Sequence, residues 1–129
     1  MNLETIPTAY ILLDGGTRSS VEIISNTTPL PMNKKDIIIA HALAGQFLGN
    51  KFIFLESGSG SENHAAADIV FNLSKIVDIP IIVGGGVHTS ESAYNLVKSG
   101  AQYIVTGTQI EKKPNLNQLL KYTNAIHSI

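Results

Sequence analysis

The chain has 129 residues, of which 43% are hydrophobic, and a net charge of −1; this length suits one domain, and this apolar content excludes a wholly disordered chain. Its nine lysines and arginines are scattered, which argues against a nucleic-acid surface or a basic patch for anionic lipids. The lack of cysteine excludes disulfides and thiolate metal sites. No apolar run approaches the roughly 18 residues of a membrane span, and the first residues, MNLETIPTAY, lack the pattern of a signal peptide. We therefore expect a soluble, cytoplasmic protein.

The first predicted element is a strand over residues 8–13, an apolar run that follows Pro7 and ends at a turn with two glycines. Residues 14–32 are polar and contain two prolines. We expect a long irregular segment here, with residues 21–24 as a short extended piece. Long loops in compact domains often carry function.

A helix is predicted over residues 33–49, because Asn33 can cap it, Asp36 suits its first turn and Gly49 can end it. The next predicted strand covers residues 52–55. Apolar side chains at 3–4 spacing define the helix face that we expect to be buried. They are Ala40, Leu43, Ala44, Phe47 and Leu48.

Two further helix–strand units are predicted, and a last helix follows residue 114. The first unit has a helix over residues 62–77 and a strand over residues 80–83. The second has a helix capped at residues 89–90 and a strand over residues 102–106. The residues of these three helices that we expect to face the core are Ile69, Leu73, Ile76, Ala93, Leu96, Val97, Leu116, Leu119, Leu120 and Ile126.

Strands and helices therefore alternate four times along the chain. The strands are continuous apolar runs, which is typical of a parallel sheet that is buried on both faces under helices. No low-complexity linker divides the sequence, so residues 1–129 are predicted to form a single α/β domain of four βα units.

Each glycine cluster follows a predicted strand, and ligands of parallel α/β folds bind at the carboxyl ends of the strands. Glycine lets backbone N–H groups approach an anion with no Cβ in between. Tight turns also use glycine, but two clusters on consecutive units favour a phosphate site, as in the loops after the last two strands of many (β/α)8 barrels. The clusters are Gly15 and Gly16, Gly58 and Gly60, Gly84, Gly85 and Gly86, and Gly107.

Glu56 ends the strand FIFLE at this same side of the sheet, where a carboxylate can orient or deprotonate a substrate hydroxyl. The alternative is a surface carboxylate or a partner of the glycine loop. Asp14 is a further candidate, whereas we interpret Tyr10 as a core residue and His88 as a solvated loop residue. Wide sequence separation argues against a metal site built from the histidines, which are His41, His64, His88 and His127.

A set of motifs over residues 4–112 resembles the geranylgeranylglyceryl phosphate synthases and the related heptaprenylglyceryl phosphate synthases. The motifs are ETIPTAYILLDGG, SNTTPLP, ALAGQFLGNKFIFLESGSG, IPIIVGGGVHTSESA and SGAQYIVTGTQIEKK. The resemblance implies a (β/α)8 barrel. It also implies a prenyltransferase of ether phospholipid biosynthesis, which moves a prenyl group from a prenyl diphosphate, such as geranylgeranyl diphosphate, to sn-glycerol 1-phosphate with Mg²⁺ on the diphosphate.

The same resemblance implies a glycerol 1-phosphate site in which loop amides hold the phosphate. It assigns Glu56 to a glycerol hydroxyl as the catalytic residue. The family usually has tyrosine where this chain has Phe54, which removes one hydroxyl, and Ser57 stands where alanine or tyrosine is common. The implied site residues are Phe54, Leu55, Glu56, Ser57, Gly58, Ser59, Gly60, Gly85, Gly86, Gly107 and Thr108.

The resemblance covers only the carboxy-terminal half of the family's barrel, strands five to eight. A full barrel takes roughly 250 residues, and the aspartates that hold Mg²⁺ in the family lie in the other half, so no metal ligand is expected here. A catalytically inactive phosphate-binding half-barrel, or another sugar-phosphate-binding barrel enzyme, is the alternative function.

Four βα units cannot close a ring, so the first and last strands are expected to expose unpaired edges. Pairing of two copies or pairing with a separate half-barrel removes these edges, and a flattened, flavodoxin-like packing is the third arrangement. We expect self-association or such pairing rather than a stable monomer.

Overall fold

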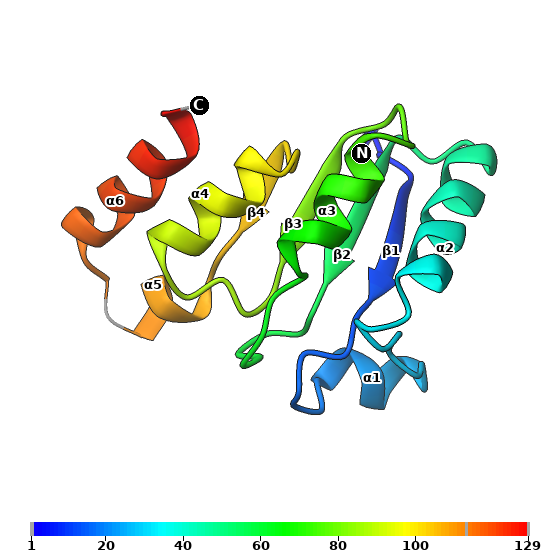
Figure 1. Cartoon of the computed structure of the whole chain (residues 1–129). Coiled ribbons are helices and arrows are strands. Elements are labelled where there is room, and N and C mark those ends of the chain that lie inside the picture. Colours follow the sequence, from blue (N-terminus) through cyan, green and yellow to red (C-terminus); the bar gives the residue numbers. More distant parts are fainter. Residues whose placement is uncertain (1, 113, 129) are drawn as a thin grey trace.

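The computed structural model describes residues 2–112 and 114–128, and its centre is a four-stranded sheet in which all neighbouring strands are parallel (Figure 1). The order of the strands in the sheet is their order in the chain. The strands are β1 (Thr8–Leu12), β2 (Phe52–Glu56), β3 (Ile81–Gly84) and β4 (Tyr103–Val105). This arrangement confirms the predicted parallel α/β fold.

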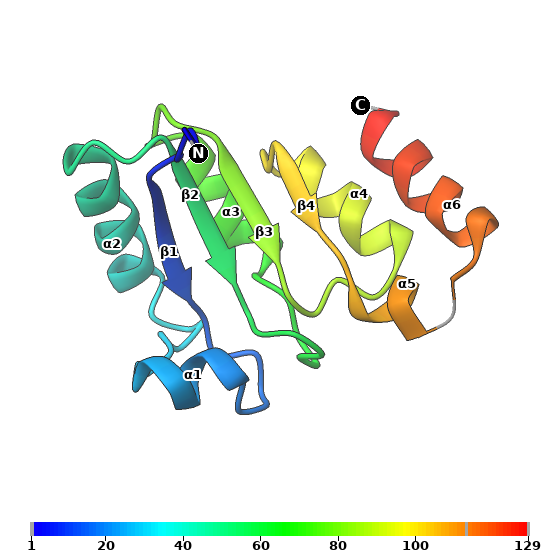
Figure 2. The ribbon, with the colours of Figure 1, turned by 180° about the vertical axis from the view of Figure 1, so that it is seen from behind.

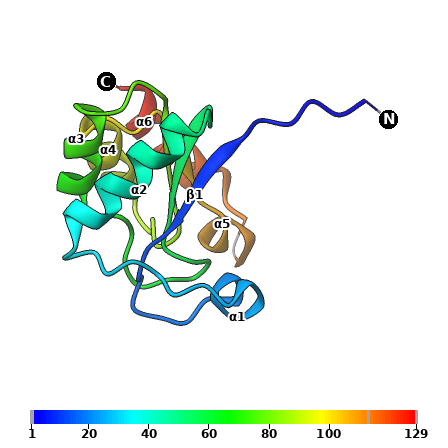
Figure 3. The same ribbon diagram turned by 90° about the vertical axis from the view of Figure 1, so that its right-hand side faces the viewer.

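Helices connect the strands and lie on one side of the sheet, as right-handed crossovers between consecutive parallel strands require. Figure 2 and Figure 3 show α2, α3, α4 and α6 on this side, and two short helices near the carboxyl ends of the strands. The helices are α1 (Ser20–Ser25), α2 (Lys35–Phe47), α3 (Ala67–Ser74), α4 (Ser90–Lys98), α5 (Thr108–Lys112) and α6 (Leu116–His127).

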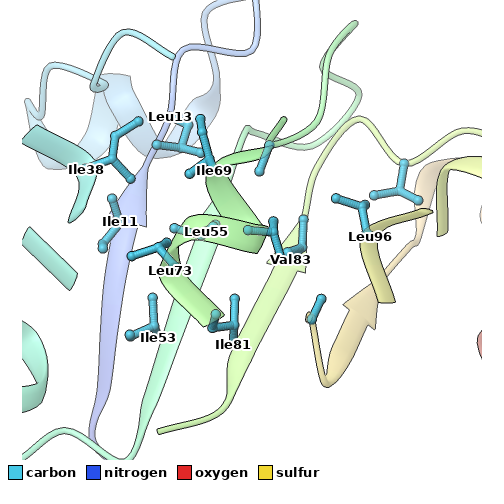
Figure 4. Packing of buried hydrophobic residues seen from close by; sticks show 14 of the residues in the cluster. Ile11, Leu13, Ile38, Ile53, Leu55, Ile69, Leu73, Ile81, Val83 and Leu96 are labelled. Carbon is cyan, nitrogen blue, oxygen red and sulfur yellow. The ribbon is translucent and has the colours of Figure 1, made fainter. Parts of the chain in front are cut away.

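The hydrophobic core lies between the sheet and these helices (Figure 4). Alternate strand residues point toward the helices, and the register places Ile53 beside Ile81 and Leu55 beside Val83. Each fully buried aliphatic side chain of this kind stabilises the fold by about 1.5–3 kcal/mol. The labelled core residues are Ile11, Leu13, Ile38, Ile53, Leu55, Ile69, Leu73, Ile81, Val83 and Leu96.

The other face of the sheet is largely open, so the prediction that the strands are buried on both faces is wrong. Tyr10 is 47% exposed, Tyr103 is 52% exposed and Val105 is 48% exposed. The reason is topological, because every crossover between consecutive strands in this order places its helix on the same side. In a closed barrel such a face lines the interior.

The predicted buried face of α2 is also wrong. The helix buries Ile38, Ala42 and Gly45, whereas Phe47 is 81% exposed. Gly45 sets this orientation, because a Cβ at that position would lie 2.4 Å from the Cβ of Ala9 on β1. The helix therefore crosses the strand at its glycine, which turns the predicted face outward. The other exposed members of that face are Ala40, Ala44 and Leu48.

Residues 21–24 form part of helix α1 rather than an extended piece. A capping box begins it, in which the Glu22 amide donates to Ser19 Oγ and the Ser19 amide donates to Glu22 Oε1. The S-x-x-E pattern is the sequence signal for this helix start. The predicted Asn33 cap is not used either, because α2 begins after Lys34 with no side-chain cap.

The last helix exposes residues that were predicted to face the core. Leu116 is 70% exposed, Leu119 is 40% exposed and Leu120 is 47% exposed. The helix packs along α4, with Tyr122 buried and Ile126 partly buried. These leucines have no covering element in the described part of the chain, and a closed barrel would place a further strand and helix beyond β4. On α3, Ile76 falls beyond the helix end and is 44% exposed.

Candidate functional site

A hollow of about 160 Å³ lies at the carboxyl ends of β2, β3 and β4, within the loops that follow these strands. Its walls come from three loops that are far apart in sequence and meet because the strands are parallel neighbours. Of the residues predicted for the site, Glu56, Ser59, Gly60, Gly85, Gly86, Gly107 and Thr108 line it.

Three glycines that line this hollow have backbone N–H groups with no protein partner in the described part of the chain. Within residues 2–112 and 114–128, the N–H groups of Gly85, Gly86 and Gly107 donate to no hydrogen bond of the protein. Among the residues that the structure describes, no lysine or arginine lines the hollow. Unpaired amides that converge on one point bind anions by their dipoles alone, so the hollow suits a phosphate group that no cationic side chain holds.

Two of these glycines are also required by packing. Gly86 has a φ of 69°, and a Cβ there would lie 2.3 Å from the backbone of Asn63. Gly85 has a φ of 74°, and its Cβ would lie 2.7 Å from Glu56 Oε1. The bare backbone therefore allows the loops to meet as well as a ligand to approach. At Gly107 the nearest atom to an added Cβ is Glu111 Oε1 at 3.2 Å, the end of a flexible side chain.

Polar contacts tie the loops around the hollow together. Ser59 Oγ lies 3.4 Å from Thr108 Oγ1, which joins the loops after β2 and β4. The Nε2–H of His88 donates to the Ser61 carbonyl at 2.7 Å, which joins the loops after β3 and β2. Thr106 Oγ1 donates to the carbonyl oxygen of Val87 at 3.3 Å. These contacts link the three loops to one another.

Glu56 is 9% exposed, so the alternative of a surface carboxylate is wrong. Its Oε1 accepts a hydrogen bond of 2.8 Å from the Gly58 amide. Burial raises the pKa of this carboxyl, and the hydrogen bond from Gly58 opposes that rise. A carboxyl group with a raised pKa at the edge of an anion site is suited to accept a proton from a neighbouring hydroxyl.

Four predicted site residues lie outside the lining. Leu55 is fully buried on the helix side of the sheet, and Ser57 is 1% exposed with no hydrogen-bond partner for its Oγ in the described part of the chain. Gly58 contributes its amide to Glu56. Phe54 lies on the open face two residues before Glu56, where its ring contacts Tyr10.

The structure also corrects the interpretation of several other residues. Tyr10 is half exposed rather than core, and His88 lines the hollow and is partly buried. Glu111 lines the hollow as well. It belongs to helix α5, which was not predicted from the sequence, so Glu111 was not among the predicted site residues. Asp14 accepts from the Gly16 amide at 3.0 Å and lies outside the hollow. Gly15 packs against Ser61, so the first glycine cluster serves packing.

No group of three or more potential metal ligands occurs among residues 2–112 and 114–128. The two carboxylates of the hollow, Glu56 and Glu111, have no third acidic or histidine ligand grouped with them there. These residues do not fit a Mg²⁺ site. In the same part of the chain, every helix is too short or too polar to cross a membrane.

We predict that Glu111→Gln increases affinity of the hollow for inorganic phosphate about fivefold, because loss of one unit charge a few ångströms away is worth about 1 kcal/mol in water. Glu111 lines the hollow, and its carboxylate faces Gly107. Isothermal titration calorimetry at low ionic strength measures the effect, which added salt should reduce. Unchanged affinity would place the phosphate away from Gly107.

The fold and its loops define an α/β protein with the architecture of four consecutive units of a (β/α)8 barrel and a glycine-lined hollow at their carboxyl ends. The chain belongs to the PcrB family, whose model matches residues 1–125. It is 42% identical over 126 residues to a geranylgeranylglyceryl phosphate synthase of Chitinophaga pinensis, covering 98% of this chain and 49% of that protein. A protein of the same name from Pyrococcus horikoshii is 40% identical, with the same coverage.

Among solved structures, the chain is similar to (S)-3-O-geranylgeranylglyceryl phosphate synthase from Thermoplasma acidophilum, described as a complex with its substrate sn-glycerol-1-phosphate. The TM-score is 0.93 at 35% identity, and the match covers all of this chain and 52% of that one. The chain thus spans about half the length of the relatives it matches.

Proposed function

We propose that this chain carries the glycerol phosphate site of a geranylgeranylglyceryl phosphate synthase, a prenyltransferase of ether phospholipid biosynthesis. The observation that carries the proposal is the hollow at β2, β3 and β4, which combines unpaired amides of Gly85, Gly86 and Gly107 with the carboxyl group of Glu56. The substrate of the Thermoplasma acidophilum relative, sn-glycerol-1-phosphate, has a phosphate for the amides and hydroxyls for the carboxylate.

In the proposed reaction, the phosphate binds the amides of the hollow and a glycerol hydroxyl lies against Glu56. The hydroxyl oxygen forms a bond to the first carbon of the prenyl chain, the bond from that carbon to the diphosphate oxygen breaks, and diphosphate leaves. Glu56 accepts the hydroxyl proton, which its raised pKa favours. Leu55, Ser57, Gly58, Ser59, Gly60 and Thr108 would shape the loop around the substrate.

We assign residues 1–129 to one domain, equivalent to strands five to eight of the barrel, in the cytoplasm. The chain spans about half of its relatives, so the prenyl diphosphate site is assigned to the remaining strands. Family resemblance assigns Mg²⁺ to that diphosphate. Because the described residues of this chain do not fit a Mg²⁺ site, the ion would be held by the other half.

We further propose that a second half-barrel, either another copy or a separate chain, pairs with the open sheet. Three features of the described residues support this pairing. They are the outer edges of β1 and β4, of which β1 is paired only by Leu30 near its carboxyl end, the exposed tyrosines Tyr10 and Tyr103 on the uncovered face, and the exposed leucines of α6. Eight strands would close the ring and bury all three. Sedimentation that shows only a compact monomer at micromolar concentration would contradict this pairing.

The alternative is a catalytically inactive phosphate-binding half-barrel. The similarity to geranylgeranylglyceryl phosphate synthases over nearly the whole chain favours it over another sugar-phosphate-binding barrel enzyme. Both proposals require a phosphate site in this chain. Calorimetry with sn-glycerol 1-phosphate tests that requirement, and saturable binding is expected. Transfer of labelled prenyl groups to glycerol phosphate in the presence of Mg²⁺, by this chain alone or with an added half-barrel, separates the two. Absence of glycerol phosphate binding would overturn both.

A further inference from the structure

We propose that Tyr10 binds the substrate, donating a hydrogen bond from its hydroxyl to the glycerol oxygen whose proton faces Glu56. This inference rests on the proposed function and adds a residue to its site. Tyr10 belongs to β1, whereas the hollow is built from the loops after β2, β3 and β4, so sequence proximity gives no hint of the role.

The register of the first two strands places Tyr10 on the same face as Glu56. Tyr10 pairs with Phe54, and Leu12 pairs with Glu56. Because side chains alternate along a strand, Tyr10, Phe54 and Glu56 all project from the face opposite the helices. β1 and β2 lie side by side in Figure 1 and Figure 2. Tyr10 is 47% exposed on that face, which in a closed barrel lines the interior.

Phe54 brings the tyrosine and the carboxylate together. Its ring meets the Tyr10 ring edge to face, with centroids 5.2 Å apart and planes at 72°. At the same time, a Cβ built on Gly84 would lie 2.8 Å from Phe54 Cε2, 3.0 Å from Phe54 Cζ and 2.7 Å from Glu56 Oε2. The tip of the Phe54 ring and the Glu56 carboxylate therefore meet above Gly84, beside the hollow.

Phenylalanine at position 54 leaves this place with no hydroxyl of its own. Phe54 Cζ and Glu56 Oε2 both lie within 3.0 Å of the same point above Gly84, so a hydroxyl on Cζ would belong to the same region of the open face as the carboxylate. The tyrosine that packs against this ring comes from the neighbouring strand. Tyr10 is thus the phenol that packs against the Phe54 ring, which has no hydroxyl of its own.

The electrostatics suit the role. Burial and, to a smaller extent, the charge of Glu56 raise the pKa of Tyr10 to about 12, so the phenol stays protonated near neutral pH and acts as a donor. Glu56 is an acceptor, and only its Oε1 is engaged by the Gly58 amide. An alcohol is both donor and acceptor. A substrate hydroxyl between the two side chains would accept from Tyr10 and donate to Glu56.

The test is calorimetry on this chain with two ligands, sn-glycerol 1-phosphate and inorganic phosphate. Tyr10→Phe should weaken glycerol phosphate binding about 3- to 10-fold, the range of one net hydrogen bond, and leave inorganic phosphate binding unchanged. Phe54→Tyr added to Tyr10→Phe should restore most of the loss. The control Tyr103→Phe, on β4 against Phe52, should bind both ligands as the wild type does.

The possible results separate the role of Tyr10 from the proposed function. If the wild type binds glycerol phosphate and Tyr10→Phe binds it equally well, the role of Tyr10 is wrong while the proposed function stands. If Tyr10→Phe loses both ligands together, Tyr10 supports the fold rather than the substrate, and the inference fails as well. If the wild type fails to bind glycerol phosphate, the proposed function is wrong and the inference falls with it.

Discussion

Gly86→Ala should destabilise the folded chain by about 3 kcal/mol or more, because two penalties add at one position. The φ of 69° lies in the left-handed region, which costs a residue with a Cβ about 1–3 kcal/mol. The new Cβ would also stand 2.3 Å from the Asn63 backbone and 2.7 Å from the His64 amide nitrogen. Neither is a flexible side-chain end, so the loops must separate, which adds about 1–3 kcal/mol. Urea denaturation measures the change.

Gly60→Ala is the matched control. Its φ is 73°, close to that of Gly86, yet an added Cβ would meet nothing within 4 Å. It carries the backbone penalty alone, about 1–3 kcal/mol. The difference between the two variants isolates the cost of pushing apart the loops after β2 and β3. Equal destabilisation would show that the contact between Gly86 and Asn63 has no energetic weight.

Glu56→Gln should weaken binding of sn-glycerol 1-phosphate about 10-fold or more, because a hydrogen bond to a charged group is worth about 1.5–3 kcal/mol. In a complete assembly that transfers prenyl groups, loss of the proton acceptor should lower the rate about 100-fold or more. Binding of inorganic phosphate should become tighter instead, since a negative charge is removed. Calorimetry with both ligands measures the contrast.

Glu111→Gln is the matched control for that variant. Both glutamates line the hollow, so either substitution removes one unit of negative charge from it. Only Glu56 is proposed to contact the glycerol hydroxyl. Glu111→Gln should therefore strengthen the binding of both sn-glycerol 1-phosphate and inorganic phosphate. A Glu56→Gln variant that binds glycerol phosphate more tightly, as Glu111→Gln does, would remove Glu56 from the substrate contacts.

Glu56→Gln should also change how the stability of the folded chain depends on pH. The pKa of Glu56 in the folded chain is raised above its ordinary value of 4.5 by burial. The folded state therefore binds the proton more tightly than the unfolded state, and stability falls as pH rises from 4.5 through the folded pKa. Glu56→Gln removes this loss, so urea midpoints of the variant should decline less over that interval.

The sequence indicated the parts of the site that depend on strand ends. A glycine or a carboxylate directly after a buried apolar run falls at the ligand side of a parallel sheet whatever the details of packing. Glu56, Gly85, Gly86 and Gly107 follow this rule, and the structure brings them to one hollow. The strand positions were readable for the same reason, because short apolar runs between turns leave little freedom in register.

Features that depend on contacts between distant elements could not be predicted from the sequence. Tyr10 looked like a core residue because its strand is apolar, and only the one-sided helix arrangement leaves it exposed beside Phe54. The face of α2 was misjudged because apolar spacing favoured Leu43 and Phe47, while the close approach of Gly45 to Ala9 fixed the rotation of the helix. Both outcomes depend on a neighbour more than 30 residues away in sequence.

The sequential order of the strands has a consequence for synthesis. As the polypeptide leaves the ribosome, each new strand finds its neighbour already made and its edge still unoccupied. Growth of the sheet is then an addition at one side, and no strand has to be inserted between two others. Domains generally fold as units, and in this topology each strand joins the sheet beside a strand that was synthesised before it.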